Sequence, residues 1–237
     1  MMRLDKYLAE MGVGTRQEVK KQIRQGKAAV NGTVVKAADT KIDETSDEVT
    51  ICGRNISYVS YEYYMLNKPA GVVSATEDRR DTTVIDLIKE KKRKDLFPVG
   101  RLDKDTEGLL LITNDGDLAH RLLAPKKHVD KVYYAKVTGI VTEEDVERFA
   151  QGIDIGTDEE EMTRPAQLDI LKSGEESEIR LTIHEGKFHQ VKRMFQAVKK
   201  EVTYLKRERM GTLCLDEDLK TGEYRLLTEE EIENVRK

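Results

Sequence analysis

The longest apolar run of this sequence is only four residues long, at positions 109–112. A helix that crosses a membrane needs about 18 consecutive apolar residues, so the sequence predicts no membrane-spanning helix. A core made from such short runs must be assembled from many short helices and strands packed in layers. The length of 237 residues allows one large domain or two smaller ones.

The sequence contains no motif typical of a metal site, a disulfide framework or a nucleotide-cofactor site. The two cysteines are far apart, and the four histidines lack metal-ligand spacing: Cys52 and Cys214, and His120, His128, His184 and His189. No Walker A loop, dinucleotide-binding glycine motif, HExxH zinc motif or GxSxG elbow is present. We therefore expect no cofactor and no metal. The N-terminal residues become charged at once, so we also expect no secretory signal and a cytoplasmic location.

The net charge of −4 hides a segregated pattern of charges. Residues 1–36 contain eight basic and three acidic side chains, and residues 184–209 contain the same numbers. A single basic stretch is most simply a solvated surface. Two of them in an acidic chain favour a surface that binds a polyanion such as nucleic acid.

Residues 1–58 are predicted to form a small domain of two helices and a hairpin. Thr15 and Glu18 form a capping box that begins the second helix, and Gly26 ends that helix. The pair Asn31-Gly32 is typical of the two-residue turn of a hairpin. A domain boundary is expected near residues 58–62.

Residues 62–237 are predicted to form a second, larger domain in which short strands alternate with short helices. Strands are expected near 63–66, 71–75, 108–113, 131–138, 166–171, 178–184 and 202–208, and helices near 82–91, 116–123, 143–151, 189–198 and 228–236. The sequence therefore predicts an α+β protein of two domains.

Asp103 lies in a predicted turn between two core strands. A strand-like run precedes it, and a fully apolar strand follows Gly108. Such a turn is a rigid platform for a carboxylate. Aspartate is also an ordinary turn residue, so the position of Asp103 indicates a functional carboxylate only together with other motifs.

The second informative stretch, residues 183–195, places a basic helix directly after a strand. The strand is expected to end at Glu185-Gly186, and the helix to start near His189. Basic side chains at a helix start oppose the helix dipole, so their presence there needs another benefit. Pairing with a buried carboxylate or with a phosphate is such a benefit.

Five motifs in this order resemble those of the RsuA-type ribosomal RNA pseudouridine synthases, and the resemblance covers nearly the whole chain. Residues 3–8 with Arg16, Ile23, Gly26 and residues 30–32 are similar to the small RNA-binding domain named after ribosomal small-subunit protein four. The four catalytic-domain motifs are residues 66–71, 100–109, 131–133 and 185–194.

The resemblance implies both the fold and the chemistry. The catalytic domain should have a mixed, mainly antiparallel sheet. Asp103 should initiate cleavage of the glycosidic bond of a uridine, Lys192 should pair with it, and Tyr133 should stack on the uracil. A nearby cation favours the ionised form of a carboxylate. The family breaks the N1–C1′ bond, rotates the base and rejoins it through C5 without a cofactor; a glycal and a covalent adduct both stay open as intermediates.

A uridine within helical RNA must be flipped out before it can react. Arg101, next to Asp103, is predicted to occupy the vacated space or to hold a phosphate, although a structural surface arginine is the simpler interpretation. The other residues predicted to bind RNA come from both domains: Arg3, Lys6, Arg16, Lys20, Lys27, Asn31, Lys68, Lys187, His189, Gln190 and Arg193.

The resemblance is greatest to the branch that acts on small-subunit rRNA, the 16S rRNA pseudouridine-516 synthases. We expect the partner to be small-subunit rRNA in an assembly intermediate, with no membrane partner and with the protein as a monomer. Two alternatives stay open. One is a large-subunit (23S) rRNA synthase of the same family, and the other is a non-catalytic rRNA-binding assembly protein.

Overall fold

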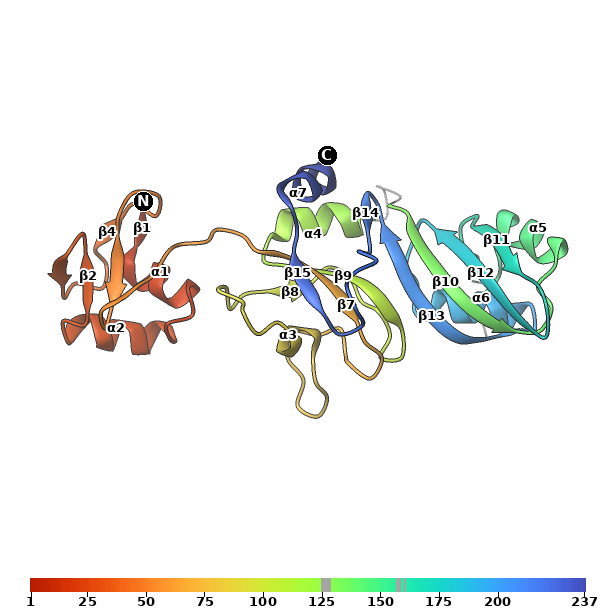
Figure 1. Cartoon of the computed structure of the whole chain (residues 1–237), viewed down its shortest axis with the longest axis horizontal. Helices are drawn as coiled ribbons and strands as arrows, with labels where there is room; N and C mark the ends of the chain where they lie inside the picture. Colours follow the sequence, from red (N-terminus) through yellow and green to blue (C-terminus); the bar gives the residue numbers. More distant parts are fainter. Residues whose placement is uncertain (125–128, 157–158, 160) are drawn as a thin grey trace. The chain divides into compact units, whose positions relative to one another are not determined.

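The computed structural model describes residues 1–124, 129–156, 159 and 161–237. The chain divides into two compact units (Figure 1). Unit 1 comprises Met1–Glu62 together with Lys89–Leu96, and unit 2 comprises Tyr63–Ile88 together with Phe97–Lys237. None of the helices in the described part of the chain combines the length and apolarity that a membrane crossing requires.

Unit 1 contains two helices and two small antiparallel sheets. Its elements are β1 (Met2–Arg3), α1 (Leu4–Glu10), α2 (Arg16–Arg24), β2 (Ala28–Val30), β3 (Thr33–Val35), β4 (Lys41–Ile42), β5 (Val49–Ile51) and β6 (Arg54–Asn55). One sheet has the order β3-β2-β5-β6, and the other pairs β1 with β4. The core between helices and strands consists of apolar residues from nearly every element: Leu4, Tyr7, Leu8, Val19, Ile23, Ala28, Ile42, Val49 and Ile51.

The local signals predicted for unit 1 are confirmed. The Thr15 hydroxyl accepts a hydrogen bond from the Glu18 N–H, and the Glu18 carboxylate accepts one from the Thr15 N–H at 2.7 Å. Gly26 follows α2 with a φ of +74°. Asn31 and Gly32 both have positive φ, as a primed hairpin turn requires. The backbone conformation at these positions is therefore determined by the local sequence.

Unit 2 is built on a nine-stranded sheet. Its path is β11-β12-β10-β13-β9-β7-β15, with β14 on β13 and β8 on β9. The strands are β7 (Tyr63–Lys68), β8 (Phe97–Pro98), β9 (Glu107–Thr113), β10 (Lys131–Thr138), β11 (Gln167–Lys172), β12 (Glu176–Ile183), β13 (Glu201–Met210), β14 (Leu213–Cys214) and β15 (Tyr224–Leu226). Among the described residues every pair of strands in this sheet is antiparallel except β9 with β13. The mixed, mainly antiparallel sheet is therefore confirmed.

Five helices accompany this sheet: α3 (Val84–Leu87), α4 (Gly116–Leu123), α5 (Glu143–Gln151), α6 (Gln190–Ala197) and α7 (Glu229–Arg236). Helices α4 and α7 lie beside each other near β7, β9 and β15 (Figure 1). Leu118 of α4 and Ile232 of α7 belong to the same apolar cluster as Leu109 and Leu111 of β9. Helix α5 packs against β11 and α6 against β13.

Two predictions for residues 71–91 are wrong. Residues 71–75 form no strand, and Val73 makes only an isolated bridge to Thr83. The helix expected at 82–91 ends at Leu87. The reason is tertiary, because residues 89–96 belong to unit 1.

Ion pairs and backbone hydrogen bonds hold residues 89–96 within unit 1. The Glu62 carboxylate accepts hydrogen bonds from the backbone N–H groups of Lys92 and Arg93. The guanidinium of Arg93, which is 4% exposed, pairs with Glu10 at 3.2 Å and with Asp95 at 2.6 Å. A continued helix would remove these partners, and a buried unpaired charge is costly.

The parallel pairing of β9 with β13 depends on Gly108. Gly108 has a φ of +100°, and a Cβ atom there would collide with the carbonyl oxygen of Arg207 and lie 2.8 Å from its nitrogen. A side chain at this position is therefore excluded both by backbone strain and by lack of space.

Gly108→Ala should lower the free energy of unfolding by about 3 kcal/mol or more, since strain and overpacking each cost about 1–3 kcal/mol. Gly116→Ala is the matched control. Gly116 begins α4, and no atom lies within 4 Å of the position that a Cβ atom would take there, so its replacement should be neutral or stabilising by up to about 1 kcal/mol. Urea unfolding of both variants measures the difference. Equal stability of the two variants would contradict the close approach of β9 and β13.

Candidate active site

Asp103 lies in the segment between β8 and β9, as expected, and its backbone is fixed from several sides. The Ser74 hydroxyl donates to the Leu102 carbonyl at 2.8 Å and accepts from the Leu102 N–H at 3.1 Å. The Gly71 N–H donates to the Lys104 carbonyl at 2.7 Å. The Asp103 side chain is 28% exposed. A carboxylate that is held rigidly and still reaches solvent can act on a bound ligand.

Lys68, at the end of β7, lies beneath this segment and is completely buried. Its ammonium donates to the backbone carbonyls of Pro69, Asp103, Lys104 and Thr106 at 2.8–3.3 Å. Burial lowers the pKa of Lys68 to about 8, and the carboxylates of Asp105 and Asp103 oppose this effect. The direct RNA contact predicted for Lys68 does not fit this placement, because the side chain is buried and its ammonium already donates to backbone carbonyls of the Asp103 segment.

Helix α6 brings two further groups to Asp103. The Lys192 ammonium lies 3.4 Å from Asp103 Oδ2, the pairing that the resemblance implied. The His189 Nε2 atom lies 3.6 Å from Asp103 Oδ1. Positive charge close to a carboxylate favours its ionised form.

Lys192 also binds Asp105, at 2.6 Å, which is closer than its distance to Asp103. This hydrogen bond holds the pKa of the Asp105 carboxyl below its usual range. A lysine ammonium has three donors, so Lys192 can bind both carboxylates. The planar guanidinium of an arginine would favour a bidentate pair with one of them. Asp105 was not predicted as a site residue. Its position two residues from Asp103, in a loop, was the available signal.

The turn at residues 185–190 is held by its own side chains. Gln190 is 4% exposed; its oxygen accepts from the Lys187 N–H and its nitrogen donates to Glu185, at 2.8 and 2.9 Å. The Lys187 ammonium donates to the Met162 carbonyl and pairs with Glu161. Arg193 donates to the carbonyls of Ile155 and Phe188. Of the four residues predicted to bind RNA here, only His189 lies with its side chain largely exposed.

Tyr133 lies on β10 and is 8% exposed, so little of its side chain is accessible. Its register partner on β13 is Arg207, which in turn is paired with Gly108 of β9. Arg207 is also buried, and its Nε donates to the Leu109 carbonyl at 2.8 Å. Burial and the Arg207 guanidinium lower the pKa of Lys131. Tyr133 thus lies two strands away from β9, the strand that follows the Asp103 segment. Arg101 is exposed beside Asp103.

The residues of unit 1 predicted to bind RNA are all partly or fully exposed: Arg3, Lys6, Arg16, Lys20, Lys27 and Asn31. Two of them surround a buried carboxylate, because Arg3 binds Asp5 at 3.0 Å and Lys20 lies 3.7 Å from it. The hydrogen bond from Arg3 holds the pKa of the Asp5 carboxyl below its usual range. Asp5 thereby fixes two cations on one side of α1 and α2.

Comparison with known proteins decides the family. A family model described as RNA pseudouridylate synthase matches residues 62–197, and a model of the S4 domain matches residues 2–49. This protein belongs to the RNA pseudouridylate synthase family. An uncharacterized RNA pseudouridine synthase of Bacillus subtilis is 48% identical over 98% of this chain and 97% of its own length. The ribosomal small subunit pseudouridine synthase A of Vibrio cholerae is 44% identical over the full length of both chains.

The architecture of the family is also found in a solved structure. A crystal structure of a pseudouridylate synthase matches with a TM-score of 0.69 and 39% identity, over 99% of this chain and 100% of that one. The sequence resemblance and the predicted S4 and synthase domains are thereby confirmed.

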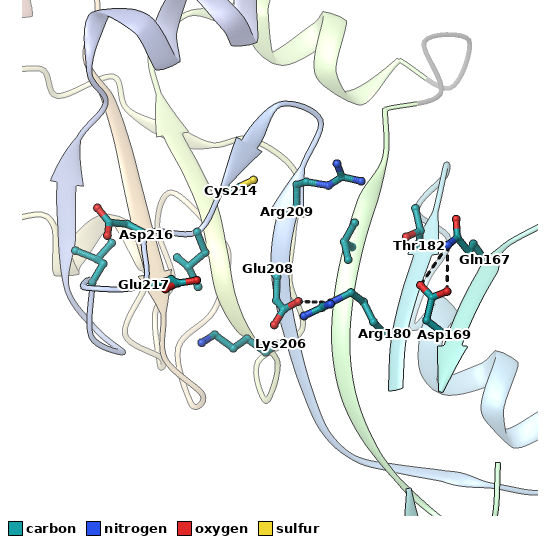
Figure 2. A pocket seen from close by; sticks show the side chains of 13 residues that line it. Gln167, Asp169, Arg180, Thr182, Lys206, Glu208, Arg209, Cys214, Asp216 and Glu217 are labelled. Atoms are coloured by element: carbon teal, nitrogen blue, oxygen red, sulfur yellow. Dashed lines mark hydrogen bonds and ion pairs between the residues drawn. The ribbon is translucent and has the colours of Figure 1, made fainter. Parts of the chain in front are cut away.

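A pocket of about 490 Å³ in unit 2 lies elsewhere. Val132 lines it, whereas Tyr133, the next residue of β10, points to the opposite face of the sheet. Figure 2 shows its charged side chains, among which Arg180 binds Glu208 at 2.8 Å. Its charges largely neutralise each other, and it is not part of the Asp103 site.

No group of three or more histidine, cysteine, aspartate or glutamate side chains suited to a metal ion occurs among the described residues. His128 lies outside those residues. His189 lies within 4 Å of one carboxylate, that of Asp103.

The buried Lys68 predicts a particular pH dependence of stability. Its pKa is about 8 in the folded chain and 10.5 ordinarily. Between these values the unfolded chain binds more protons, so this group makes the free energy of unfolding rise with pH from about 8 to 10.5. Lys68→Met should be less stable than the wild type at every pH and should lack this rise.

Lys104→Met is the control, because Lys104 is an exposed lysine of the same segment that pairs with Asp81. Urea unfolding at pH 7, 8, 9 and 10 gives the curves. The Lys104 variant should follow the wild type in parallel. A Lys68 variant whose curve also runs parallel to that of the wild type would contradict the buried, pKa-shifted ammonium.

Proposed function

We propose that this protein converts one uridine of 16S rRNA to pseudouridine, as the pseudouridine-516 synthases do. The observation that carries the proposal is the arrangement around Asp103: a rigid, partly exposed carboxylate with the Lys192 ammonium at 3.4 Å and His189 at 3.6 Å. A protein that only bound RNA would have no need of a carboxylate fixed in this way. The name of the Vibrio cholerae relative supports the small subunit as the source of the RNA.

The residues then have distinct roles. Asp103, with the Lys192 ammonium 3.4 Å away, initiates cleavage of the N1–C1′ bond of the uridine. Tyr133 contacts the uracil while the base turns. A C5–C1′ bond forms, and the C5 proton is lost as N1 gains one, so the product has the same atoms as the substrate. Lys68 and Asp105 position Asp103 and Lys192 without touching the base.

The RNA is proposed to be bound chiefly by unit 1 and by the exposed groups near Asp103. Residues 1–58 would act as the RNA-binding domain and residues 62–237 as the catalytic domain. The S4 domain matched in unit 1 and its exposed cations support this division. Phosphate contacts of this kind give an affinity that falls with salt and depends little on sequence. The proposed setting is the cytoplasm, on a small subunit that is still assembling, where the target helix is open enough for base flipping.

The reaction and its target are tested together with wild-type protein and Asp103→Asn. Isomerisation leaves the mass unchanged, so pseudouridine is mapped by carbodiimide labelling and reverse-transcription stops on 16S RNA, a partly assembled small subunit and 23S RNA. The wild type should give one stop, in small-subunit RNA. Tritium release from [5-³H]uridine RNA should fall by at least about 10³-fold in Asp103→Asn.

Asp105→Asn is the matched variant, and it should lose no more than about tenfold because Lys192 keeps its contact with Asp103. A stop found only in 23S RNA would favour the large-subunit alternative. Turnover by Asp103→Asn within tenfold of the wild type would remove Asp103 from the mechanism. No turnover by the wild type on any of these RNAs, with binding intact, would favour the non-catalytic assembly protein.

The role of unit 1 is tested in the full chain, because deleting residues 1–58 would uncover residues 89–96, which pack in the same unit. Replacing Arg16, Lys20 and Lys27 by Gln should reduce the slope of log affinity against log salt by about 2–3. The control makes the same change of charge in unit 2, at Lys136, Lys172 and Lys220, and should leave the slope unchanged. Equal slopes for all three proteins would contradict RNA binding by this face of unit 1.

A further inference from the structure

We propose that the exposed ring of Phe188 is a stacking platform for the RNA base next to the target uridine. This inference rests on the function proposed above and adds a binding contact to it. Phe188 is 74% exposed, more than any other large hydrophobic side chain of the described residues except Met1. A single exposed apolar side chain is common, so the inference depends on how this ring is held and where it lies.

The ring of Phe188 is held in a fixed orientation. It stacks on the imidazole of His189, with centroids 3.8 Å apart and an angle of 21° between the planes. The carbonyl of Phe188 accepts a hydrogen bond from Arg193, which also binds Ile155 and Glu161. A side chain ordered before binding loses less entropy when a ligand arrives.

The backbone next to this ring is strained. His189 has a φ of 47°, in the left-handed region that side chains other than glycine seldom adopt. The conformation is maintained because Gln190, buried behind it, accepts from the Lys187 N–H. Strain of this kind persists only where the surrounding structure enforces it. Here it presents the aromatic ring outward on a short, tight turn.

The position of the ring relative to Asp103 identifies the ligand. His189 contacts the ring of Phe188 on one side and lies 3.6 Å from the Asp103 carboxylate. The face of the Phe188 ring that is turned away from His189 meets no other aromatic ring within the described ranges. A base flipped toward Asp103 leaves its neighbour without a stacking partner on one side. The exposed ring of Phe188, which is connected to Asp103 through His189, offers that neighbouring base a new stacking partner.

A nucleobase fits this platform better than an apolar peptide. Lys187, Lys192 and Arg193 pair with the carboxylates of Glu161, Asp103 and Asp105, so these cations offset the negative charge that would repel a phosphate backbone near the ring. Every base has a π face, so stacking supplies affinity without fixing the sequence. Single-stranded or splayed bases are commonly bound on aromatic side chains in this way.

The first test measures kcat and KM for tritium release from [5-³H]uridine 16S RNA. Phe188→Ala should raise KM by about 5- to 100-fold, the range expected for the loss of one base–aromatic stack. Phe188→Trp and Phe188→Tyr should stay within about twofold of the wild type. Phe188→Leu keeps an apolar side chain without the flat ring and should behave like Phe188→Ala. Ile140→Ala, which removes another exposed apolar side chain of unit 2 (61% exposed), should have no effect.

The second test removes the stacked base instead of the ring. A short RNA containing the 16S uridine that the pseudouridine-516 synthases modify is made with an abasic nucleotide on the 5′ or 3′ side of that uridine, and its binding is measured by fluorescence anisotropy in the Asp103→Asn background. One of the two abasic RNAs should bind about 5- to 100-fold more weakly, and adding Phe188→Ala should weaken it little further. Such non-additivity shows that ring and base interact.

Several results would overturn the platform. Phe188→Leu equal to the wild type would show that a flat ring is not required. Additive effects of Phe188→Ala and of both abasic nucleotides would show that the ring contacts something else, such as a protein of the assembling particle. Because binding is measured without turnover, failure of the platform is separate from failure of the isomerase. Wild-type protein that binds with this coupling but releases no tritium would refute the proposed reaction alone.

Discussion

The site depends above all on one buried ammonium, that of Lys68. It is fully enclosed and donates to the Pro69 carbonyl and to three carbonyls of the segment that carries Asp103. Burying a charge is costly unless polar groups replace its water, and here the carbonyl dipoles do so. These hydrogen bonds connect the end of β7 to the segment before β9, so the segment that carries the carboxylate is anchored to a strand of the sheet.

The other half of the site reaches Asp103 from α6, nearly ninety residues later in the chain (Lys192 and Asp105 are separated by 87 positions). What brings the two halves together is the parallel pairing of β9 with β13, which continues the sheet from β7 to β12. Gly108 permits that pairing because its lack of a side chain lets the Arg207 backbone approach. Gly108, which has no side chain, therefore helps to bring Lys192 and Asp103 together.

The turn at residues 185–190 shows how polar side chains are divided between structure and function. Gln190 and Arg193 are used within the protein, where they fix the backbone around Phe188 and His189. The exposed side chains of the turn are then those of Phe188 and His189, whose rings stack on each other. Both the basic character that suggested RNA binding and the aromatic ring that no motif emphasised belong to the same preorganised surface.

The sequence by itself determined the features that depend on a few neighbouring residues. The capping box of Thr15, the apolar strand after Gly108 and the motif that carries Asp103 could all be recognised, since each is decided by local backbone chemistry or by a pattern shared within the family. The tertiary structure alone decided which polar side chains are buried and with what they pair. Lys68 is buried and not exposed for RNA binding, and Lys192 forms an ion pair with Asp105 as well as with Asp103. Residues 89–91, predicted to end the helix that begins near residue 82, belong to unit 1 together with residues 92–96. In each case the deciding partner is far away in the sequence, and the cost of an unpaired buried charge is set by that partner.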